Sequence, residues 1–232
     1  MYIVSPLSQC ASPEKRDKFL GHIAQIALIA LATEPNCYGY AWFLSAGDND
    51  VVEGHWLRGF EVYASPEANQ VEHRASDEYK AFRIVVGEEG LLTKPSDLRF
   101  WRPTGIGFLT KRNQEVFGGQ YSSAGEQYII TDEFSPKLGE KEELFDILRG
   151  VAEAALNDET VLSFWVQDRF GTETSTREEG IEDTVYIFLR CGDQASAKVF
   201  WEQTVGSKSK KVEHRNRRTT TWIGSGIGFL GR

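Results

Sequence analysis

The spacing of apolar residues predicts a long helix in each half of the chain. Between residues 139 and 157, apolar side chains recur every three or four positions, which is the repeat of one helical face. Residues 13–33 contain the most apolar run of the sequence, which suits a buried helix and is too short for a membrane span. Ser12-Pro13 and Ser135-Pro136 precede these stretches, and each is predicted to cap a helix with proline in its first turn.

Runs rich in aromatic and β-branched residues predict strands that also come in corresponding pairs. The predicted strands are 2–5, 36–46 and 54–64 in the first half and 127–134, 160–169 and 183–190 in the second. The polar stretches 47–50 and 172–182 are predicted to join the second and third strand of each half as a hairpin. A second helix is predicted over 65–82, with a break near Ser76, and its counterpart over 193–203.

One nine-residue motif occurs twice in the sequence. Residues 101–109 read WRPTGIGFL and residues 222–230 read WIGSGIGFL, so six of nine positions are identical. The copies lie 222 − 101 = 121 positions apart in a chain of 232 residues, which indicates an internal duplication rather than two unrelated glycine-rich endings. Trp42 and Trp165 are predicted to point to corresponding faces. The predicted division is a first domain at 1–112, a linker at 113–126 and a second domain at 127–232.

Each predicted domain has the element order β-α-β-β-α-β, which is that of the ferredoxin-like fold. Two helices cover one face of such a four-stranded sheet, and the other face needs an apolar partner. Aromatic residues occur at both alternating positions of the strands, so the other half of the chain can supply that partner. The predicted fold class is α+β, with two tandem ferredoxin-like domains that form an intrachain pseudo-dimeric α/β barrel.

Charge and cysteine usage narrow the range of partners and compartments. The formal net charge of −8 argues against a nucleic-acid-binding protein, which needs a basic face. Cys10, Cys37 and Cys191 show no paired spacing, so they are predicted to be free thiols in the reducing cytoplasm. The chain begins like a strand without the basic region of a signal peptide, and no membrane partner is expected. The basic stretch 208–218 is interpreted as a solvated loop or as a region that steers an anionic substrate.

Residues 56–82 carry a family resemblance. The strand WLRGFEVY at 56–63 is followed by SPEA at 65–68, HRAS at 73–76 and YKAF at 79–82. This pattern resembles the antibiotic biosynthesis monooxygenase family of the dimeric α/β-barrel superfamily, and it is most similar to tandem fungal members in which one chain supplies both lobes. The resemblance implies this fold. It also implies an activity within the family's range, which includes cofactor-free oxygenases of electron-rich aromatic or enolic substrates, haem-degrading enzymes and proteins with no assigned reaction.

Comparison of the two halves predicts which of them contains a pocket. Four polar residues of the first half align with apolar or small residues of the second. The pairs are His22 with Ile147, Gln25 with Gly150, Glu61 with Ile187, and His73 with Val199 or Phe200. A lobe with a pocket keeps polar groups there, whereas a supporting lobe can fill its interior with apolar side chains. We therefore predict that the first half holds the pocket and that the second is degenerate.

His73 is the first candidate for a catalytic residue, and His22 is the second. An imidazole titrates near neutral pH, so it can take a proton from a phenol or an enol. The resulting anion can give one electron to dioxygen, and the radical pair then recombines. The alternatives are a surface histidine beside Arg74 for His73 and a satisfied core histidine for His22.

Aromatic and basic residues of the first half are candidates for substrate binding. The aromatic candidates, which can wall a flat ligand or form ordinary core, are Tyr40, Trp42, Trp56, Tyr63 and Trp101. Arg58 or Arg74 can hold a substrate carboxylate, and the alternative for both is a surface role.

The sequence predicts no bound cofactor and no metal, with dioxygen as co-substrate. The four histidines and three cysteines show no metal-ligand spacing. No Gly-x-Gly-x-x-Gly motif opens a helix after a strand, and no Gly-x-Ser-x-Gly nucleophile motif occurs. Haem-degrading members of the resembled family use an asparagine on the first strand. Residues 2–5 contain none, so haem is not expected.

The predicted function is a cofactor-independent monooxygenase of secondary metabolism that hydroxylates or oxidises a small hydrophobic metabolite, such as an aromatic polyketide or an oxylipin. The alternatives are a non-oxidative cyclase on the same fold and a small-molecule-binding or stress-response protein without turnover. Dioxygen consumption separates the first two, and cavities filled by side chains in both halves would favour the third. The predicted ligand is neutral or anionic, and the predicted assembly is a monomeric pseudo-dimer or a homodimer.

Overall fold

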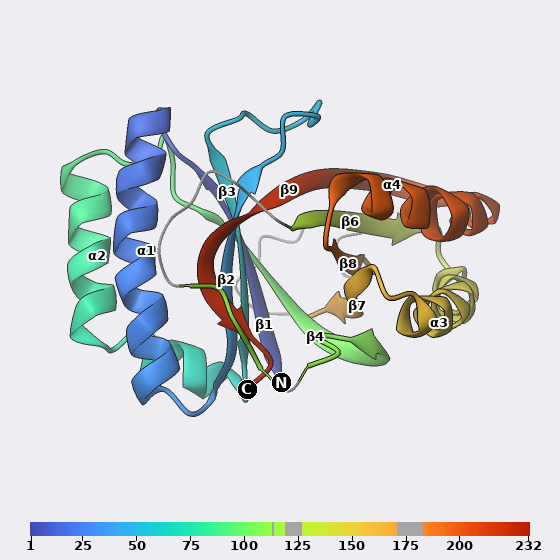
Figure 1. Cartoon of the computed structure of the whole chain (residues 1–232), viewed down its shortest axis with the longest axis horizontal. Helices are drawn as coiled ribbons and strands as arrows, with labels where there is room; N and C mark the ends of the chain where they lie inside the picture. Colours follow the sequence, from blue (N-terminus) through green and yellow to red (C-terminus); the bar gives the residue numbers. More distant parts are fainter. Residues whose placement is uncertain (113, 119–126, 171–182) are drawn as a thin grey trace. The chain divides into compact units, whose positions relative to one another are not determined.

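The computed structural model describes residues 1–112, 114–118, 127–170 and 183–232, and its elements are labelled in Figure 1. The chain forms two compact units. Unit 1 comprises Met1–Arg99, Arg112–Gly125 and Trp222–Arg232, and unit 2 comprises Phe100–Lys111 and Glu126–Thr221. The predicted hairpin turn 172–182 lies outside the described residues.

Unit 1 has the β-α-β-β-α-β order of a ferredoxin-like domain. Its elements are β1 (Tyr2–Gln9), α1 (Pro13–Thr33), β2 (Cys37–Ser45), β3 (Trp56–Tyr63), the π-helical turn η1 (Ala68–His73), α2 (Asp77–Glu88) and the start of β4 (Asp97–Phe108). The strands follow the order β2-β3-β1-β4, and β3 is antiparallel to both of its neighbours. Helices α1 and α2 lie side by side on one face of this sheet (Figure 1).

Unit 2 repeats this plan. Its elements are β6 (Tyr128–Pro136), α3 (Lys141–Asn157), β7 (Val161–Arg169), β8 (Val185–Cys191), α4 (Gln194–Trp201), the short helices η2 (Glu202–Gly206) and η3 (Ser209–Lys211), and the start of β9 (His214–Leu230). Its strand order is β4-β7-β8-β6-β9. The π-helical turn follows α4 here, whereas it precedes α2 in unit 1.

Each unit is completed by a strand whose sequence belongs mainly to the other half. The end of β9 pairs with β2 in unit 1, and the short strand β5 (Glu115–Val116) pairs with β9. The end of β4 pairs with β7 in unit 2. The strand order is therefore cyclic, which is the connectivity of two ferredoxin-like domains in a pseudo-dimeric α/β barrel, and the predicted α+β class is confirmed. The predicted boundaries separate the two sequence repeats, but the compact units exchange the ends of those repeats.

The repeated motif is a glycine-rich bulge at these exchanged ends. Gly107 has φ +87°, and a Cβ there would lie 2.0 Å from the carbonyl oxygen of Phe164. Gly228 has φ +112°, and a Cβ there would lie 1.9 Å from the carbonyl oxygen of Tyr40. Both strand pairs shift register at this point. Only glycine allows the two backbones to approach this closely, so the motif has a structural role in both units.

Hydroxyl groups in the motif reveal which residues of the two units correspond. The Thr104 hydroxyl donates to the carbonyl of Val166 at 2.7 Å, and the Ser225 hydroxyl donates to the carbonyl of Trp42 at 2.5 Å. Trp42 therefore corresponds to Val166. Trp165 pairs with Gly107, and the corresponding pair in unit 1 is Ala41 with Gly228, so Trp165 corresponds to Ala41. Adjacent residues of a strand point to opposite faces, so the prediction that Trp42 and Trp165 point to corresponding faces is wrong.

The two long helices begin differently. Ser12 caps α1 as predicted, because its hydroxyl accepts the backbone N–H of Lys15 at 3.2 Å. The predicted cap at Ser135 is wrong. Ser135 is buried in β6, its hydroxyl bonds that of Thr184 at 2.8 Å, and α3 begins only at Lys141. Strand β6 extends beyond the predicted run because the Ser135 hydroxyl forms a hydrogen bond within the sheet.

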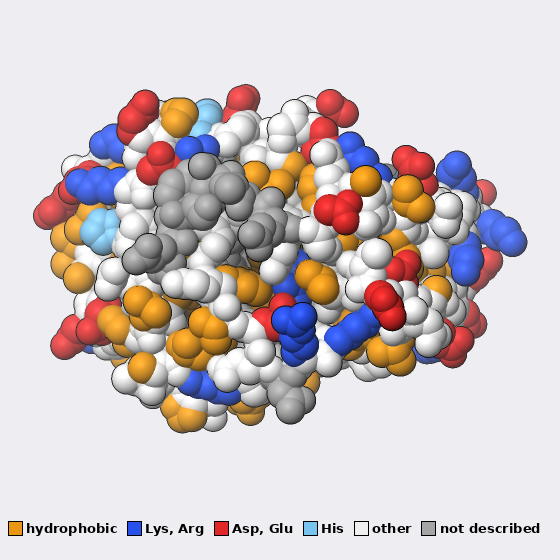
Figure 2. Space-filling view, viewed as in Figure 1, with side chains coloured by type: hydrophobic (Ala, Val, Ile, Leu, Met, Phe, Trp, Pro, Cys, Tyr) orange, Lys and Arg blue, Asp and Glu red, His pale blue; other side chains and the backbone are white. Residues whose placement is uncertain are grey.

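Part of the basic stretch 208–218 is neutralised within unit 2. Arg215 forms an ion pair with Asp183, and Arg217 forms one with Asp132. Acidic and basic side chains are interspersed over the face of the molecule that Figure 2 shows. In the described residues no helix is long and apolar enough to cross a bilayer. Within the same residues, no three histidine, cysteine or acidic side chains are grouped so that they could hold a metal ion.

Candidate functional site

Unit 1 contains a cavity of about 150 Å³ between its two helices and its sheet. A cavity of about this volume accommodates a single aromatic ring such as benzene. The sheet contributes Val4, Pro6, Tyr40, Trp42 and Glu61 to its wall. Phe19 and Ile23 of α1 and Phe82 of α2 close the opposite side. The cavity therefore has mostly apolar and aromatic walls with a small number of polar groups, as small-molecule sites usually do.

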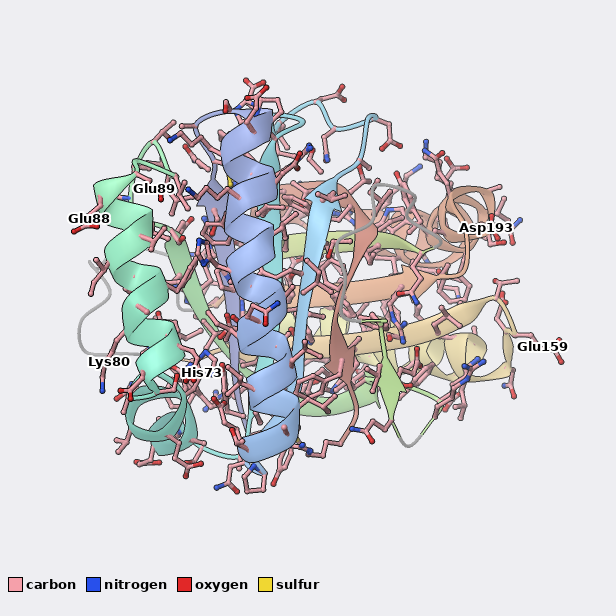
Figure 3. The ribbon with its side chains drawn as sticks, turned by 60° about the vertical axis from the view of Figure 1, so that its left-hand side comes forward. His73, Lys80, Glu88, Glu89, Glu159 and Asp193 are labelled. Carbon is pink, nitrogen blue, oxygen red and sulfur yellow. The ribbon has the colours of Figure 1, made fainter. Side chains whose placement is uncertain are left out.

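His73 occupies the end of η1, where the chain turns into α2 (Figure 3). Its side chain is 1% exposed and lines the cavity. Its Nδ1 lies 2.9 and 3.2 Å from the two carboxylate oxygens of Glu34. Its Nε2 is buried without a hydrogen-bond partner in the described residues. When Nδ1–H donates to Glu34, the neutral ring keeps a lone pair on Nε2, so the free nitrogen can accept a proton from a ligand.

Glu34 is held in place at the end of α1. It is the C-cap of that helix and is almost fully buried. Its backbone carbonyl accepts hydrogen bonds from the backbone N–H of Cys37 and from the Arg232 guanidinium. The position of this carboxylate is thus fixed by the chain on both sides and by Arg232.

Three tyrosines surround the imidazole ring. The ring centroids of Tyr79, Tyr40 and Tyr63 lie 5.1, 5.3 and 5.5 Å from that of His73. Burial raises the pKa of Tyr40 and Tyr63 well above the usual tyrosine range, so both phenols stay neutral. Tyr40 and Tyr79 line the cavity, and Tyr63 supports the site from behind.

Glu61 is a second carboxyl group in the cavity wall. Burial raises its pKa, and this effect outweighs the opposing influence of His73, the Tyr63 hydrogen bond and Arg74. The Tyr63 hydroxyl donates to Glu61 Oε2 at 2.9 Å. A carboxyl group that keeps its proton to higher pH can donate a hydrogen bond to a ligand, whereas the free His73 nitrogen can accept one.

The amide Oδ1 of Asn69 is a further buried polar atom of the wall that lacks a partner among the described residues. The indole Nε1 of Trp42 forms no hydrogen bond of normal geometry there, but the indole interacts with the Tyr40 hydroxyl and opposes the rise of that group's pKa. Buried polar atoms are nearly always hydrogen-bonded in folded proteins. Acceptors at Asn69 and His73 around one cavity are therefore suited to a ligand with its own polar groups.

The structure brings four of the predicted site residues to this cavity: Tyr40, Trp42, His73 and Arg74. His22 is half-buried on α1 beside Phe82, with ring centroids 6.1 Å apart, and it is not in the cavity wall. Gln25 is exposed on the same helix, so its predicted place in a pocket is wrong. Trp56 is half-buried at the start of β3, outside the wall.

Trp101 and Arg58 belong to the sheets rather than to the cavity. Trp101 lies in unit 2, where its ring stacks on Tyr186 at 4.9 Å. Arg58 is buried in unit 1, where it donates to the Ser5 hydroxyl at 3.3 Å and lies over the Trp222 ring at 5.4 Å. Neither residue lies in the wall of the cavity.

Corresponding positions of unit 2 are filled. Tyr40 pairs with Glu61 in unit 1, and their counterparts Phe164 and Leu189 pair in unit 2. Leu189, rather than the predicted Ile187, thus takes the place of Glu61.

A paired arginine occupies another of these positions. Arg217 corresponds to Ser96 of the cavity wall. Arg217 lies five residues before Trp222, and Ser96 lies five residues before Trp101, the equivalent residue of the repeated motif. The Nε of Arg217 donates to Asp132 at 2.9 Å, and its guanidinium lies 4.9 Å from the Phe134 ring centroid. At these positions unit 2 has apolar or ion-paired side chains, whereas unit 1 has the polar side chains of Glu61 and Ser96 in its cavity wall.

Sequence reasoning missed Glu34 and Asn69. Glu34 had one available signal, because an acidic residue at the C-terminal end of a helix opposes the helix dipole and requires another reason to be there. Asn69 had none, since its inward direction depends on the π-helical turn of η1. Val199, one of two proposed counterparts of His73, is 52% exposed, whereas Phe200 is buried.

Comparisons with known proteins identify the fold. No family model and no curated protein matches the chain. A Lactobacillus acidophilus protein provisionally named a monooxygenase matches with TM-score 0.72 at 9% identity, over 99% of this chain and 97% of its own. A Fusobacterium nucleatum protein with the same provisional name matches with TM-score 0.73 at 11% identity, over 100% and 94%. An anthrone oxidase-like protein matches with TM-score 0.60 at 14% identity, over 98% and 92%.

These likenesses cover nearly the whole chain in each case. The fold of this chain is therefore that of these solved structures over nearly its whole length. At identities of 9–14%, the likeness concerns the fold and does not transfer any residue's role.

Proposed function

We propose that unit 1 is a monooxygenase that oxidises a small aromatic or enolic metabolite with dioxygen and without a bound cofactor. The observation that carries this proposal is the free Nε2 of His73, which is buried in an aromatic cavity while Nδ1 is bound to Glu34. The names of the matched monooxygenases and of the anthrone oxidase-like protein are consistent with such a reaction on this fold.

The first step is removal of a proton from the substrate. His73 Nε2 takes the proton from a phenol, an enol or an activated C–H next to a carbonyl. The ring then becomes an imidazolium, and the Glu34 carboxylate at 2.9 Å stabilises its positive charge. Because the nitrogen is buried, bulk water has little access to it.

The second step joins the substrate to oxygen. The substrate anion transfers one electron to dioxygen, and the substrate radical and superoxide recombine to form a C–O bond. The peroxide takes up a proton, its O–O bond breaks, and a substrate hydrogen leaves with the departing oxygen as water. For a methylene substrate the balance is R₂CH₂ + O₂ → R₂C=O + H₂O. Protonated Glu61 and the His73 imidazolium are the groups in the wall that can supply the proton.

Replacement of His73 by alanine tests this role directly. A general base contributes about 100- to 10,000-fold to rate, so His73→Ala should reduce dioxygen uptake with a single-ring phenolic or enolic substrate by that factor. His22→Ala is the matched control, since this histidine lies outside the cavity wall. The measurement is dioxygen uptake by metal-free protein with an oxygen electrode, combined with a thermal melt of each variant.

The outcomes separate the candidate functions. Full activity of a folded His73→Ala variant would refute the proposed base. Substrate consumption without dioxygen uptake would instead indicate acid–base chemistry by His73 and Glu61, as in a cyclase. Binding without conversion, in wild-type protein supplied with dioxygen, would indicate a binding protein.

A further inference from the structure

Two arginines line the cavity without forming ion pairs. Arg74 follows His73 at the end of η1 and is half-buried, and Arg83 is exposed on α2. Neither guanidinium makes an ion pair or a hydrogen bond in the part of the chain that the structure describes. Tyr79, one helical turn before Arg83, also lines the cavity, so this face of α2 is directed to it.

Several other arginines of the protein form ion pairs with carboxylates. Arg102 binds Asp168 at 2.8 Å, and Arg217 binds Asp132 at 2.9 Å. The chain has 34 acidic and 26 basic residues, so acidic partners are abundant. Arg74 and Arg83 both line one cavity without an ion-paired carboxylate among the described residues, so their guanidinium groups are available to an anionic ligand.

The carboxylates of the site do not neutralise these arginines. Glu34 is engaged by His73. Glu61 is buried and forms no ion pair with Arg74; burial raises its pKa, and the charge of Arg74 opposes that rise. In the part of the chain that the structure describes, the two guanidinium groups at the cavity therefore have no ion-paired carboxylate.

We propose that the substrate carries a carboxylate group that Arg74 and Arg83 bind at the rim while its aromatic or enolic ring lies against His73. This inference deepens the proposed function and rests on it for the identity of the reacting ring. A guanidinium presents paired N–H donors that match the two oxygens of a carboxylate. The cavity of about 150 Å³ holds the ring, and the exposed Arg83 places the charged group on the solvent side.

Binding of a matched pair of ligands tests the proposal. The probes are salicylic acid and its methyl ester, which share a single phenol ring and differ in charge. Charge-assisted hydrogen bonds change binding by roughly tenfold to a hundredfold. The acid should therefore bind wild-type protein at least about tenfold more tightly than the ester, as measured by titration calorimetry.

Variants identify the groups responsible. Arg74→Gln and Arg83→Gln should each weaken binding of the acid by roughly tenfold and leave binding of the ester unchanged. Lys80→Gln is the matched control, because Lys80 is exposed on the same helix, outside the cavity wall, and its loss changes the net charge equally (Figure 3). Arg83 is on the surface, so Arg83→Gln tests the proposal even if Arg74→Gln fails to fold.

Equal affinity for acid and ester would overturn the proposal, and so would an equal loss in Lys80→Gln and the two arginine variants. Dioxygen uptake with the ester distinguishes this failure from failure of the proposed function. Turnover of the ester without preference for the acid would refute only the proposed carboxylate-binding role of the two arginines. Selective binding of the acid without dioxygen uptake from either probe would refute only the proposed monooxygenase activity.

Discussion

At the scale of single residues, the site depends on the tautomer of one imidazole. With the proton on Nδ1, His73 donates to Glu34 at 2.9 Å and keeps a lone pair on its buried Nε2, and the residue lines the cavity. The carboxylate acts on the substrate only through the histidine. Glu34 is therefore a positioning residue, whereas His73 is the group that touches the substrate.

The substitution Glu34→Gln should lower turnover by roughly 100- to 10,000-fold. The glutamine amide can donate to Nδ1, which leaves the proton on Nε2 and removes the base. The tautomer can be read from the ¹⁵N chemical shifts of the His73 ring, and this readout would not move if Glu34 were only structural. Glu72→Gln is a suitable control, since Glu72 bonds Asn36 on the surface. An unchanged tautomer with unchanged turnover would refute this role.

The residues of the site differ in how well the sequence predicts them. His73, Trp42 and Tyr40 could be predicted because their residue types suggest chemistry or ligand contact wherever they occur. Glu34 and Asn69 could not, because surface acids and amides are common and only their burial beside His73 gives them a role. The position of Trp101 and Arg58 outside the wall could not be predicted, because a strand pattern does not tell which face of a sheet meets the helices.

At the scale of elements, the glycine-rich end of β9 determines how closely two strands approach. The Cβ of an alanine at position 228 would lie 1.9 Å from the Tyr40 carbonyl oxygen, at a φ of +112° that L-residues rarely adopt. Tyr40 lines the cavity on the opposite side of that backbone. A shift of β9 is therefore transmitted directly to the site.

The substitution Gly228→Ala should destabilise the protein by about 2–6 kcal/mol, because backbone strain and overpacking each cost about 1–3 kcal/mol. Gly105→Ala is the matched control. Gly105 also has positive φ, at +81°, but a Cβ there meets no atom within 4 Å, so only the strain should appear. Urea denaturation of both variants measures the difference. An equal decrease in the free energy of unfolding of both variants would show that the close approach at Gly228 does not contribute to the destabilisation.

Most elements could be predicted from apolar spacing alone, and the reasons for the exceptions are local. The predicted helix 13–33 agrees with α1, because Ser12 caps it and its apolar face is buried against the sheet. The strand β1 extends beyond the predicted 2–5 to Gln9. Pro6 there interrupts the pattern but not the strand. Register and strand exchange could not be predicted, since periodicity identifies a strand but not its partner.

At the scale of the whole molecule, neither half of the sequence contains a complete unit. Residues 1–112 lack the Trp222–Arg232 segment that pairs with β2 and contacts Glu34. An unpaired strand edge exposes backbone groups that require a partner. The sequence repeat and the folding unit are therefore different divisions of the same chain.

Expression of the halves as separate chains tests this organisation. Residues 1–126 alone should not bind the salicylate probe, because β2 and Glu34 lack their partners. Co-expression with residues 127–232 should restore binding, since the second chain supplies the end of β9. Calorimetry on the purified products makes the comparison, with the intact chain as reference. Full affinity of residues 1–126 alone would contradict the requirement for strand exchange.

The exchange also sets an order of events during synthesis. Unit 1 contains the first residues of the chain, yet its sheet waits for Trp222–Arg232. At the usual rate of about 5–20 residues per second, the interval between translation of residue 99 and residue 232 is roughly 7–27 seconds. Throughout that time, the edge of β2 in the nascent first domain is unpaired, and Glu34 lacks its hydrogen bond from Arg232. The pocket closest to the start of the sequence is thus among the last parts of the protein to be finished.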